Sequence, residues 1–447
     1  MYLLGVLFVA IGISVSIALH EVGHLLPAKK FGVKVTQYMI GFGPTIWSRR
    51  RGETEYGVKA IPLGGYIRMI GMFPPRPGTD ASMLRISSSG RFSQLMDQAR
   101  QESMEQVKPG DEDRVFYKLS APRKLVVMLG GPTMNLVIAV VLMTGIFTLH
   151  GISEYTARIS AVSQCVQTVP ATGTAAEKCS PSDPKAPANL AGIRPGDRLI
   201  SLAGQPVSNW DDVRALTRPN GGKRIDVVVE RAGQRLDLSA TPILKEMARL
   251  DTDNKAVLGS DGKPVIDRVG FLGLSPSPEI VRQPLAAVPA LIGNQLAAIA
   301  GVVLRLPEKM AGIAEAAFGD GARDPNGPMS VVGVGRVAGE VTDGQLSGFA
   351  DSGLSKLVFL IGLIASLNLA LFVFNMIPLL PLDGGHAAGA LWEGLKRQVA
   401  RLRGRPNPGY VDVAKALPVA YVVSIALIGM SVLLIYADLV KPVRLGG

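Results

Sequence analysis

The sequence predicts a polytopic α-helical membrane protein with about four transmembrane helices, a membrane-associated β-hairpin and one small extracytoplasmic domain of short strands. Three observations predict this class. The chain has 447 residues, is 47% hydrophobic and has a positive mean hydropathy of +0.28. Its apolar residues gather in long uncharged runs, and a run of 18 or more is typical of a membrane span. Segments rich in Lys and Arg separate these runs.

Four runs are long enough to cross a hydrocarbon core of about 30 Å at a rise of about 1.5 Å per residue. They lie at 1–19, 125–149, 357–382 and 416–437. The expected transmembrane helices are accordingly 1–24, 124–149, 356–386 and 416–437. The alternative for the first run is a cleavable signal peptide, but this run lacks a basic N-terminal region and a small-residue cleavage site.

The distribution of charge predicts the orientation. Segment 25–123 contains "WSRRR" and segment 387–415 contains "KRQVARLRGR". Short basic loops stay in the cytoplasm, whereas long domains such as 150–355 translocate largely regardless of charge. We therefore interpret the net charge of +11 as a topology signal and as contact with anionic lipid, and expect no nucleic-acid partner.

The first run leads directly into "HEVGH" at 20–24. On a helix, His20 and His24 share one face, so both imidazoles can bind one Zn²⁺, and Glu21 can act as general base on the bound water. The same five-residue pattern also occurs by chance. Two features favour a metal site here: the chain has only four histidines, and ionisable residues in a membrane helix are costly and usually functional.

Catalytic zinc usually has three protein ligands, and the third candidate is Asp383 in "NMIPLLPLDGGH". Pro378 and Pro381 are expected to break the third apolar helix, which brings Asp383 to the side of the membrane where the first span ends. An ordinary Asp-Gly turn is the alternative. The other histidines are weaker candidates, because His150 lies at the opposite end of the second span and His386 follows the acid.

A first-span HExxH followed far along the chain by NxxPxxxLDGG resembles the site-2 protease family of intramembrane zinc metalloproteases. The strings "IGFGPTIWS", "GGPTMN" and "NGPMSVVGVG" are similar to further family motifs. The resemblance implies His20, His24 and Asp383 as metal ligands and Glu21 as the catalytic base. It also implies Asn375 as a substrate-binding residue, for which a helix–helix hydrogen bond is the alternative.

Residues 186–243 contain short alternating stretches and a short helix at "WDDVRALT", separated by Gly and Pro-Gly turns. With "AGIRPGDRL", this region resembles a PDZ domain. We expect 150–245 to form one extracytoplasmic PDZ domain with an N-terminal loop, which would bind an extended peptide at a sheet edge. A spacer without a peptide ligand is the alternative. Cys165 and Cys179 in the loop could form a disulfide or remain two unpaired thiols.

The remaining segments carry fewer signals. Segment 25–123 is expected to hold a cytoplasmic-side β-hairpin at 52–71, around "PLGG", whose free edge an unwound stretch of substrate would complete. The charged insertion at 77–123 is assigned no chemistry. We expect an extracytoplasmic linker with interfacial amphipathic helices at 246–355, with the helix pair at 284–318 and a Gly-rich loop at 319–355. A cytoplasmic loop is expected at 387–415.

Because of its single PDZ domain, the chain resembles most closely the actinobacterial regulators of intramembrane proteolysis. This resemblance implies a zinc-dependent endopeptidase in a bacterial plasma membrane, with its active site toward the cytoplasm. The expected partners are the lipid bilayer and membrane-embedded substrates, such as single-span anti-sigma factors that another protease has already trimmed outside. Two alternatives stay open: clearance of remnant signal peptides, and a non-catalytic membrane scaffold that presents the PDZ domain.

Overall fold

The computed structural model describes residues 1–75, 91–166, 179, 183–249, 256–259, 263–319, 321, 323–324, 327–344 and 352–443. Part of the expected insertion at 77–123 and the first residue of "NGPMSVVGVG" lie outside the described residues. The chain divides into two compact units, Met1–Thr148 with Pro284–Gly447 and Leu149–Gln283. Each unit is described by itself.

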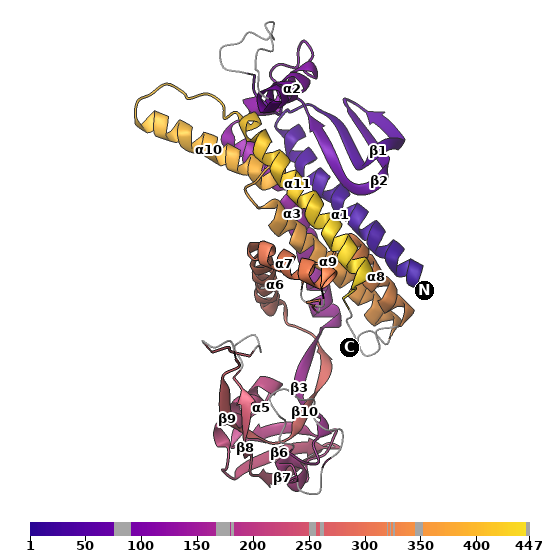
Figure 1. Cartoon of the computed structure of the whole chain (residues 1–447), viewed down its shortest axis with the longest axis vertical. Helices are drawn as coiled ribbons and strands as arrows, with labels where there is room; N and C mark the ends of the chain where they lie inside the picture. Colours follow the sequence, from indigo (N-terminus) through magenta and orange to yellow (C-terminus); the bar gives the residue numbers. More distant parts are fainter. Residues whose placement is uncertain are drawn as a thin grey trace. The chain divides into compact units, whose positions relative to one another are not determined.

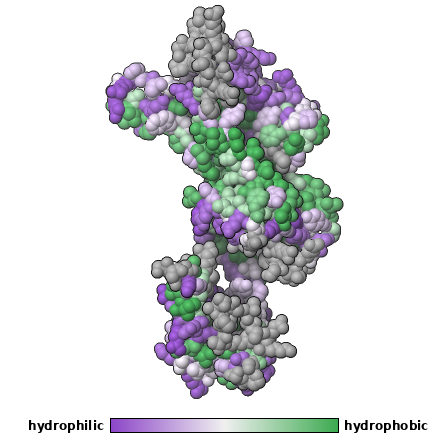
Figure 2. Space-filling model, in the orientation of Figure 1, coloured by the Kyte–Doolittle hydropathy of each residue, from purple (hydrophilic) through white to green (hydrophobic). Residues whose placement is uncertain are grey.

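The first unit is built on long apolar helices (Figure 1). Five helices of the described chain are long and apolar enough to cross a membrane, by length and composition. They contain α1 (Tyr2–Lys30), α3 (Ala121–Gly145, continued by a π-helical turn at Ile146–His150), α6 (Val288–Leu304), α9 (Gly353–Asn375) and α11 (Leu417–Val440). Figure 2 shows hydrophobic residues gathered across these helices. The chain is a polytopic helical membrane protein.

The segment at 284–318 forms two helices, α6 and α7 (Leu306–Phe318), which break at Arg305 just before Pro307. Met310 and Ile313 of α7 pack against Ala437 of α11. Helix α6, extended from Leu285, has the length and composition of a span. It is therefore a candidate fifth span beyond the about four that the sequence predicts.

The expected Gly-rich loop at 319–355 is wrong over part of its length, because it contains α8 (Val331–Asp343). The Ser330 hydroxyl caps this helix by accepting a hydrogen bond from the Gly333 N–H (3.1 Å). Its glycines serve close packing: a Cβ on Gly339 would lie 2.4 Å from the ring of Tyr2 in α1. Small residues of this kind let membrane helices approach closely.

The expected third helix at 356–386 and the loop at 387–415 also differ from the structure. Helix α9 ends at Asn375, and a new helix, α10 (Asp383–Leu402), begins at the acid of "LDGG". Pro378 and Pro381 lie in the break, where they remove two backbone donors that a continuous helix would need. Asp383 is therefore the first residue of a helix.

The hairpin is longer than expected and turns elsewhere. Strand β1 (Val35–Arg51) and strand β2 (Thr54–Met69) join at Gly52, which has a positive φ of 64°. The "PLGG" string instead marks a bend in β2, and each strand folds back so that Ile40 pairs with both Val58 and Gly65. The stretch 65–69 forms one edge of this small sheet. Helix α2 (Arg91–Glu105) and a 3-10 turn at Phe116–Lys118 follow.

One apolar cluster joins the end of α1 to its neighbours. It contains Leu25 of α1, Met69 of β2, Val127 of α3 and Ala387 of α10, all buried. Burial of this apolar surface holds together four elements that are distant in the sequence. The residues of "HEVGH" lie immediately before it on α1.

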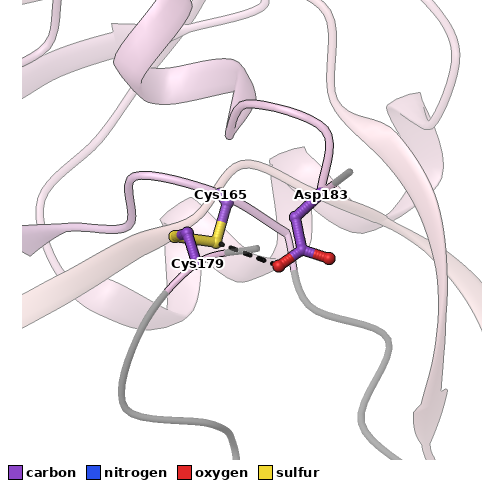
Figure 3. Close-up of a disulfide and its surroundings, with 3 residues drawn as sticks. All are labelled: Cys165, Cys179 and Asp183. Carbon is purple, nitrogen blue, oxygen red and sulfur yellow. Dashed lines mark hydrogen bonds between the residues drawn. A yellow bond between two sulfur atoms is a disulfide. The ribbon is translucent and has the colours of Figure 1, made fainter. Parts of the chain in front are cut away.

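The second unit is a β-rich domain with one short helix pair. Its main sheet has the strand order β10-β3-β4-β6-β7, with β5 paired to β4, and β8 pairs with β9. The bounds are β3 (Ile152–Val162), α4 (Pro187–Leu190), β4 (Arg198–Leu202), β5 (Gln205–Pro206), α5 (Trp210–Thr217), β6 (Ile225–Arg231), β7 (Gln234–Ala240), β8 (Ile243–Ala248), β9 (Ile266–Phe271) and β10 (Leu274–Val281). Asn209 and Asp212 form a capping box on α5. Cys165 and Cys179 form a disulfide beside Asp183 (Figure 3), which decides the pairing that the sequence leaves open.

Candidate metal centre

The two histidines of "HEVGH" lie one turn apart on α1, where helix geometry predicts a shared face. Their Nε2 atoms are 3.2 Å apart, and their rings meet edge to face with centroids 4.9 Å apart. Glu21 is buried on the next position of the helix. A Cβ on Gly65 of β2 would lie 3.1 Å from the Glu21 Cγ, so β2 closely approaches this side chain.

Asp383 reaches the same point from α10. Its Oδ2 lies 3.2 Å from His20 Nε2 and 3.3 Å from His24 Nε2. Among the described residues, these three form the one group of His, Cys, Asp or Glu side chains that could hold a metal ion. The side chains that the sequence analysis singled out as ligands therefore meet in space.

The spacing of the three ligand atoms fits a tetrahedral ion. Ligands at about 2.0–2.1 Å from zinc, separated by the tetrahedral angle, lie about 3.3–3.4 Å from one another. The three observed separations are 3.2, 3.2 and 3.3 Å. One ion can therefore contact all three atoms with little movement, leaving a fourth position open.

The outer nitrogens of both imidazoles contact α3. His24 Nδ1 lies 2.7 Å from the backbone carbonyl of Val127. A carbonyl only accepts, so Nδ1 carries the proton and Nε2 keeps a free lone pair toward the centre. This contact orients His24 as a metal ligand in the way that outer-shell carbonyls commonly do.

His20 has the same kind of partner in Asn135, which is 1% exposed. The Asn135 Nδ2 lies 3.1 Å from His20 Nδ1, while Asn135 Oδ1 is buried without a hydrogen-bond partner in the described part of the chain. The two orientations of an amide have nearly the same shape. A half-turn of this amide lets Oδ1 accept from Nδ1–H, which removes the orphaned oxygen and frees His20 Nε2 for an ion.

Glycines of "GGPTMN" create the space that this arrangement needs. A Cβ on Gly130 would lie 2.0 Å from the Gly23 carbonyl oxygen, so α1 and α3 approach closely there. A Cβ on Gly131 would lie 2.1 Å from His24 Nε2 and 2.7 Å from His20 Cε1. Sequence reasoning missed these supporting roles, and the signal that could have found them is the "GGPTMN" string itself.

The other candidates lie outside the group. His150 ends the π-helical turn after α3, and His386 lies one helical turn beyond Asp383 on α10. Asn375 is the last residue of α9 and is partly exposed. The helix–helix hydrogen bond considered for it is made by Asn368, whose Nδ2 donates to Ser16 Oγ of α1 (2.8 Å).

Comparison with known proteins gives consistent results. The model of "Peptidase family M50" matches residues 8–419. The chain is similar to "Zinc metalloprotease Rip1" of Mycobacterium tuberculosis (strain H37Rv), with 33% identity over 100% of this chain and 99% of the relative. It is 31% identical to the Mycolicibacterium smegmatis protein of the same name, over the same shares of both chains. A "putative zinc metalloprotease" of Brucella suis is 27% identical over 86% of this chain and 84% of its own length.

Proposed function

The chain belongs to peptidase family M50, the site-2 protease family, and from this premise we propose that His20, His24 and Asp383 hold the catalytic zinc of an intramembrane endopeptidase. One observation carries the proposal. Asp383 lies beside His20 and His24, which precede it by more than 350 residues, and the distances among the three ligand atoms suit one tetrahedral ion. The names of the relatives support zinc as the ion. Zinc supplies a Lewis acid that makes water a nucleophile near neutral pH.

Glu21 would transfer the proton in this mechanism. It lies next to His20 in the sequence, buried beside the ligand cluster, where its carboxylate can accept a proton from the attacking water. The same group then delivers that proton to the amine that leaves when the peptide bond breaks. Asn375, at the end of α9 before the break, would donate its amide N–H to the carbonyl oxygen of the cleaved bond.

Substrate would reach Glu21 as an extended strand along the edge of β2. The stretch 65–69 is a sheet edge, and its first residue, Gly65, packs against Glu21. A groove of about 420 Å³ follows this edge, lined by Ile67 and Met69 on one side and by Ala99 and Ser103 of α2 on the other. An unwound transmembrane segment has backbone N–H and C=O groups without partners. As an added strand it could form hydrogen bonds with the backbone groups at the edge of β2.

The orientation proposed from the basic segments places the metal centre toward the cytoplasm and the second unit outside. We propose that this unit is a PDZ domain that engages the outer portion of substrates. A groove of about 170 Å³ supports this role, lined by Trp210 and Val213 of α5 and by Phe271 and Leu274. The proposed substrates are single-span membrane proteins, such as anti-sigma factors that another protease has trimmed outside, in regulated intramembrane proteolysis and transmembrane signalling.

The test is Glu21→Gln in the full-length protein, reconstituted with a tagged single-span reporter. Cleavage should fall to the uncatalysed background while zinc stays near one ion per chain, because the amide cannot take the proton and Glu21 is not a ligand. Glu308→Gln, at an exposed position of α7, is the matched control and should retain cleavage. Cleavage by the Glu21 variant would reject the mechanism, and protein without zinc would favour a scaffold.

The substrate class has its own experiment. Membrane proteomes of cells with the active enzyme and with Glu21→Gln should differ in single-span proteins that accumulate as fragments trimmed on the outer side. Accumulation of free signal peptides instead would favour clearance of remnants as the function.

A further inference from the structure

Helix α10 carries an apolar stripe that faces away from the protein. Leu391, Leu395 and Leu402 share one face at positions i, i+4 and i+11, and are 59%, 51% and 80% exposed. Trp392 flanks the stripe and is 55% exposed. Large apolar side chains exposed in a row on one helix mark an interaction surface.

The opposite side of α10 is fixed to α3, so the stripe cannot turn into the core. Ala387 and Ala390 are buried on this side. The buried carboxylate of Glu393 accepts a hydrogen bond from Lys124 Nζ of α3 (2.8 Å) and forms an ion pair with Arg397 Nη2 of its own helix (2.8 Å). Rotating α10 would break these buried ion pairs, which is strongly unfavourable.

Between the stripe and the start of α3 runs a groove of about 590 Å³. Pro122 and Leu125 of α3 line one wall, and Leu391, Leu395 and Gln398 of α10 line the other. A candidate span begins at Ala121, so this groove opens where a span meets the headgroup layer. The walls of this groove are mostly apolar.

The exposed charged residues around the stripe are all basic. Lys396 borders it, and Arg401, Arg403 and Arg405 are exposed at the end of the helix and just beyond. From 384 to 405 the only acid is Glu393, which is buried and paired. Figure 2 shows hydrophilic residues gathered at this end of α10. Basic residues beside an apolar helix face suit the headgroups of anionic lipids.

We propose that α10 lies in the headgroup layer of the bilayer and that an anionic glycerophospholipid occupies the groove between α3 and α10. The acyl chain contacts the leucine stripe, and the phosphate faces the basic end of the helix. This lipid site goes beyond the proposed function, and it is built on the helix that begins with Asp383. The bilayer thereby fixes the depth of Asp383, a proposed metal ligand, without contacting the metal centre.

Tryptophan fluorescence tests the site without any substrate. The chain has three tryptophans, so Trp47→Phe with Trp210→Phe leaves Trp392 as the reporter. The protein is reconstituted in nanodiscs of phosphatidylcholine with a minor fraction of phosphatidylglycerol, and bromine is carried on the upper acyl chain of either lipid. At equal mole fraction, brominated phosphatidylglycerol should quench Trp392 about twofold more than brominated phosphatidylcholine.

The basic residues should account for this preference. Arg401→Gln, Arg403→Gln and Arg405→Gln together should make quenching by the two lipids equal. The matched control is Arg198→Gln, Arg224→Gln and Arg235→Gln in the second unit, which changes the net charge equally and should retain the preference. If both lipids quench Trp392 equally while Arg401, Arg403 and Arg405 are still present, the anionic-lipid site is wrong. If neither lipid quenches Trp392, the location of α10 in the headgroup layer is wrong.

A second measurement is available if the tryptophan variants fail to fold. Because Cys165 and Cys179 are disulfide-bonded, Leu395→Cys supplies a single thiol for a spin label. In the bilayer this label should be more accessible to oxygen than to a water-soluble nickel chelate, whereas a label at Asn407→Cys should show the reverse. A water-exposed label at 395 would contradict the proposal, whether or not the chain proves to be a protease.

Discussion

Each unit holds a carboxylate among basic or imidazole groups, but the groups that neutralise this carboxylate differ between the two units. In the second unit, Asp197 is 1% exposed and fully paired. The Arg231 Nε and Nη2 each donate to one of its oxygens at 2.8 Å, and the Arg194 N–H donates to it at 2.8 Å. In the first unit, Asp383 shares its oxygen with two imidazoles, and the neighbouring Asn135 keeps a buried oxygen without a partner in the described chain.

The difference fits a structural role for the Asp197 cluster and the proposed metal-binding role for the Asp383 cluster. Asp197 has a cation of its own, so the second unit needs nothing further to bury it. Once the outer nitrogens of His20 and His24 carry the protons, lone pairs of His20, His24 and Asp383 face one point, and this arrangement suits a bound cation. The two clusters should therefore respond oppositely to substitution and to removal of zinc.

The largest effect should come from filling the space beside the imidazoles. Gly131→Ala places a Cβ 2.1 Å from His24 Nε2, which displaces the ring that would bind the ion. We expect zinc affinity to fall by more than about 100-fold, beyond the range typical of outer-shell changes. Competition with a chelator measures this. Gly145→Ala, on the same helix with open space around it, is the control and should retain zinc, and equal affinities would contradict the geometry.

Asp197→Asn should destabilise the second unit and leave zinc binding unchanged. The amide keeps the size of the side chain but removes the negative charge that pairs with Arg231, so the free energy of unfolding of this unit should fall. Hydrogen-exchange mass spectrometry of the full chain should show faster exchange confined to 149–283. Weaker zinc binding in this variant would contradict the separation of the clusters.

The same pair predicts a pH dependence. Burial alone would raise the pKa of the Asp197 carboxyl, but Arg231 and the Arg194 N–H outweigh it and hold that pKa below its usual value. The stability from this group is fully present above the unfolded pKa of about 3.9 and is lost as pH falls through the lower folded pKa. Protection of the second unit should therefore decline only at acidic pH, and should decline less in Asp197→Asn.

A smaller effect is expected at Asn135. Asn135→Leu removes the acceptor for His20 Nδ1–H, and zinc affinity should fall about 10–100-fold. Asn135→Asp keeps an acceptor and should recover most of the loss. Since the chain has four histidines, nitrogen NMR of labelled protein can read the His20 tautomer directly. A wild-type tautomer in Asn135→Leu would show that Asn135 does not set it.

The sequence predicted the meeting of His20, His24 and Asp383 better than it predicted the contacts around them. Helix periodicity alone puts His20 and His24 on one face, and two prolines indicate the break that starts α10 at Asp383. The roles of Asn135 and the Val127 carbonyl depend on the register between α1 and α3, which the Gly23–Gly130 approach sets in three dimensions.

Glycine was the main source of error elsewhere. The hairpin was assigned to the wrong turn because both Gly52 and Gly64 suit a reversal of the chain, and only pairing of β1 with both halves of β2 decides between them. Helix α8 was mistaken for a loop because its glycines, which lower intrinsic helix propensity, serve close packing against α1. One further feature has a different cause. Strands β3 and β10 pair although they are far apart in the sequence, and local sequence patterns do not reveal such a pairing.

The central claim is that residue 383 binds the same ion as His20 and His24, and X-ray absorption at the zinc edge tests it most directly. In the native protein we expect only nitrogen and oxygen neighbours, at about 2.0–2.1 Å. In full-length Asp383→Cys, one sulfur neighbour should appear at about 2.3 Å. A zinc-loaded variant whose spectrum still shows only nitrogen and oxygen would place the ion elsewhere and contradict the account.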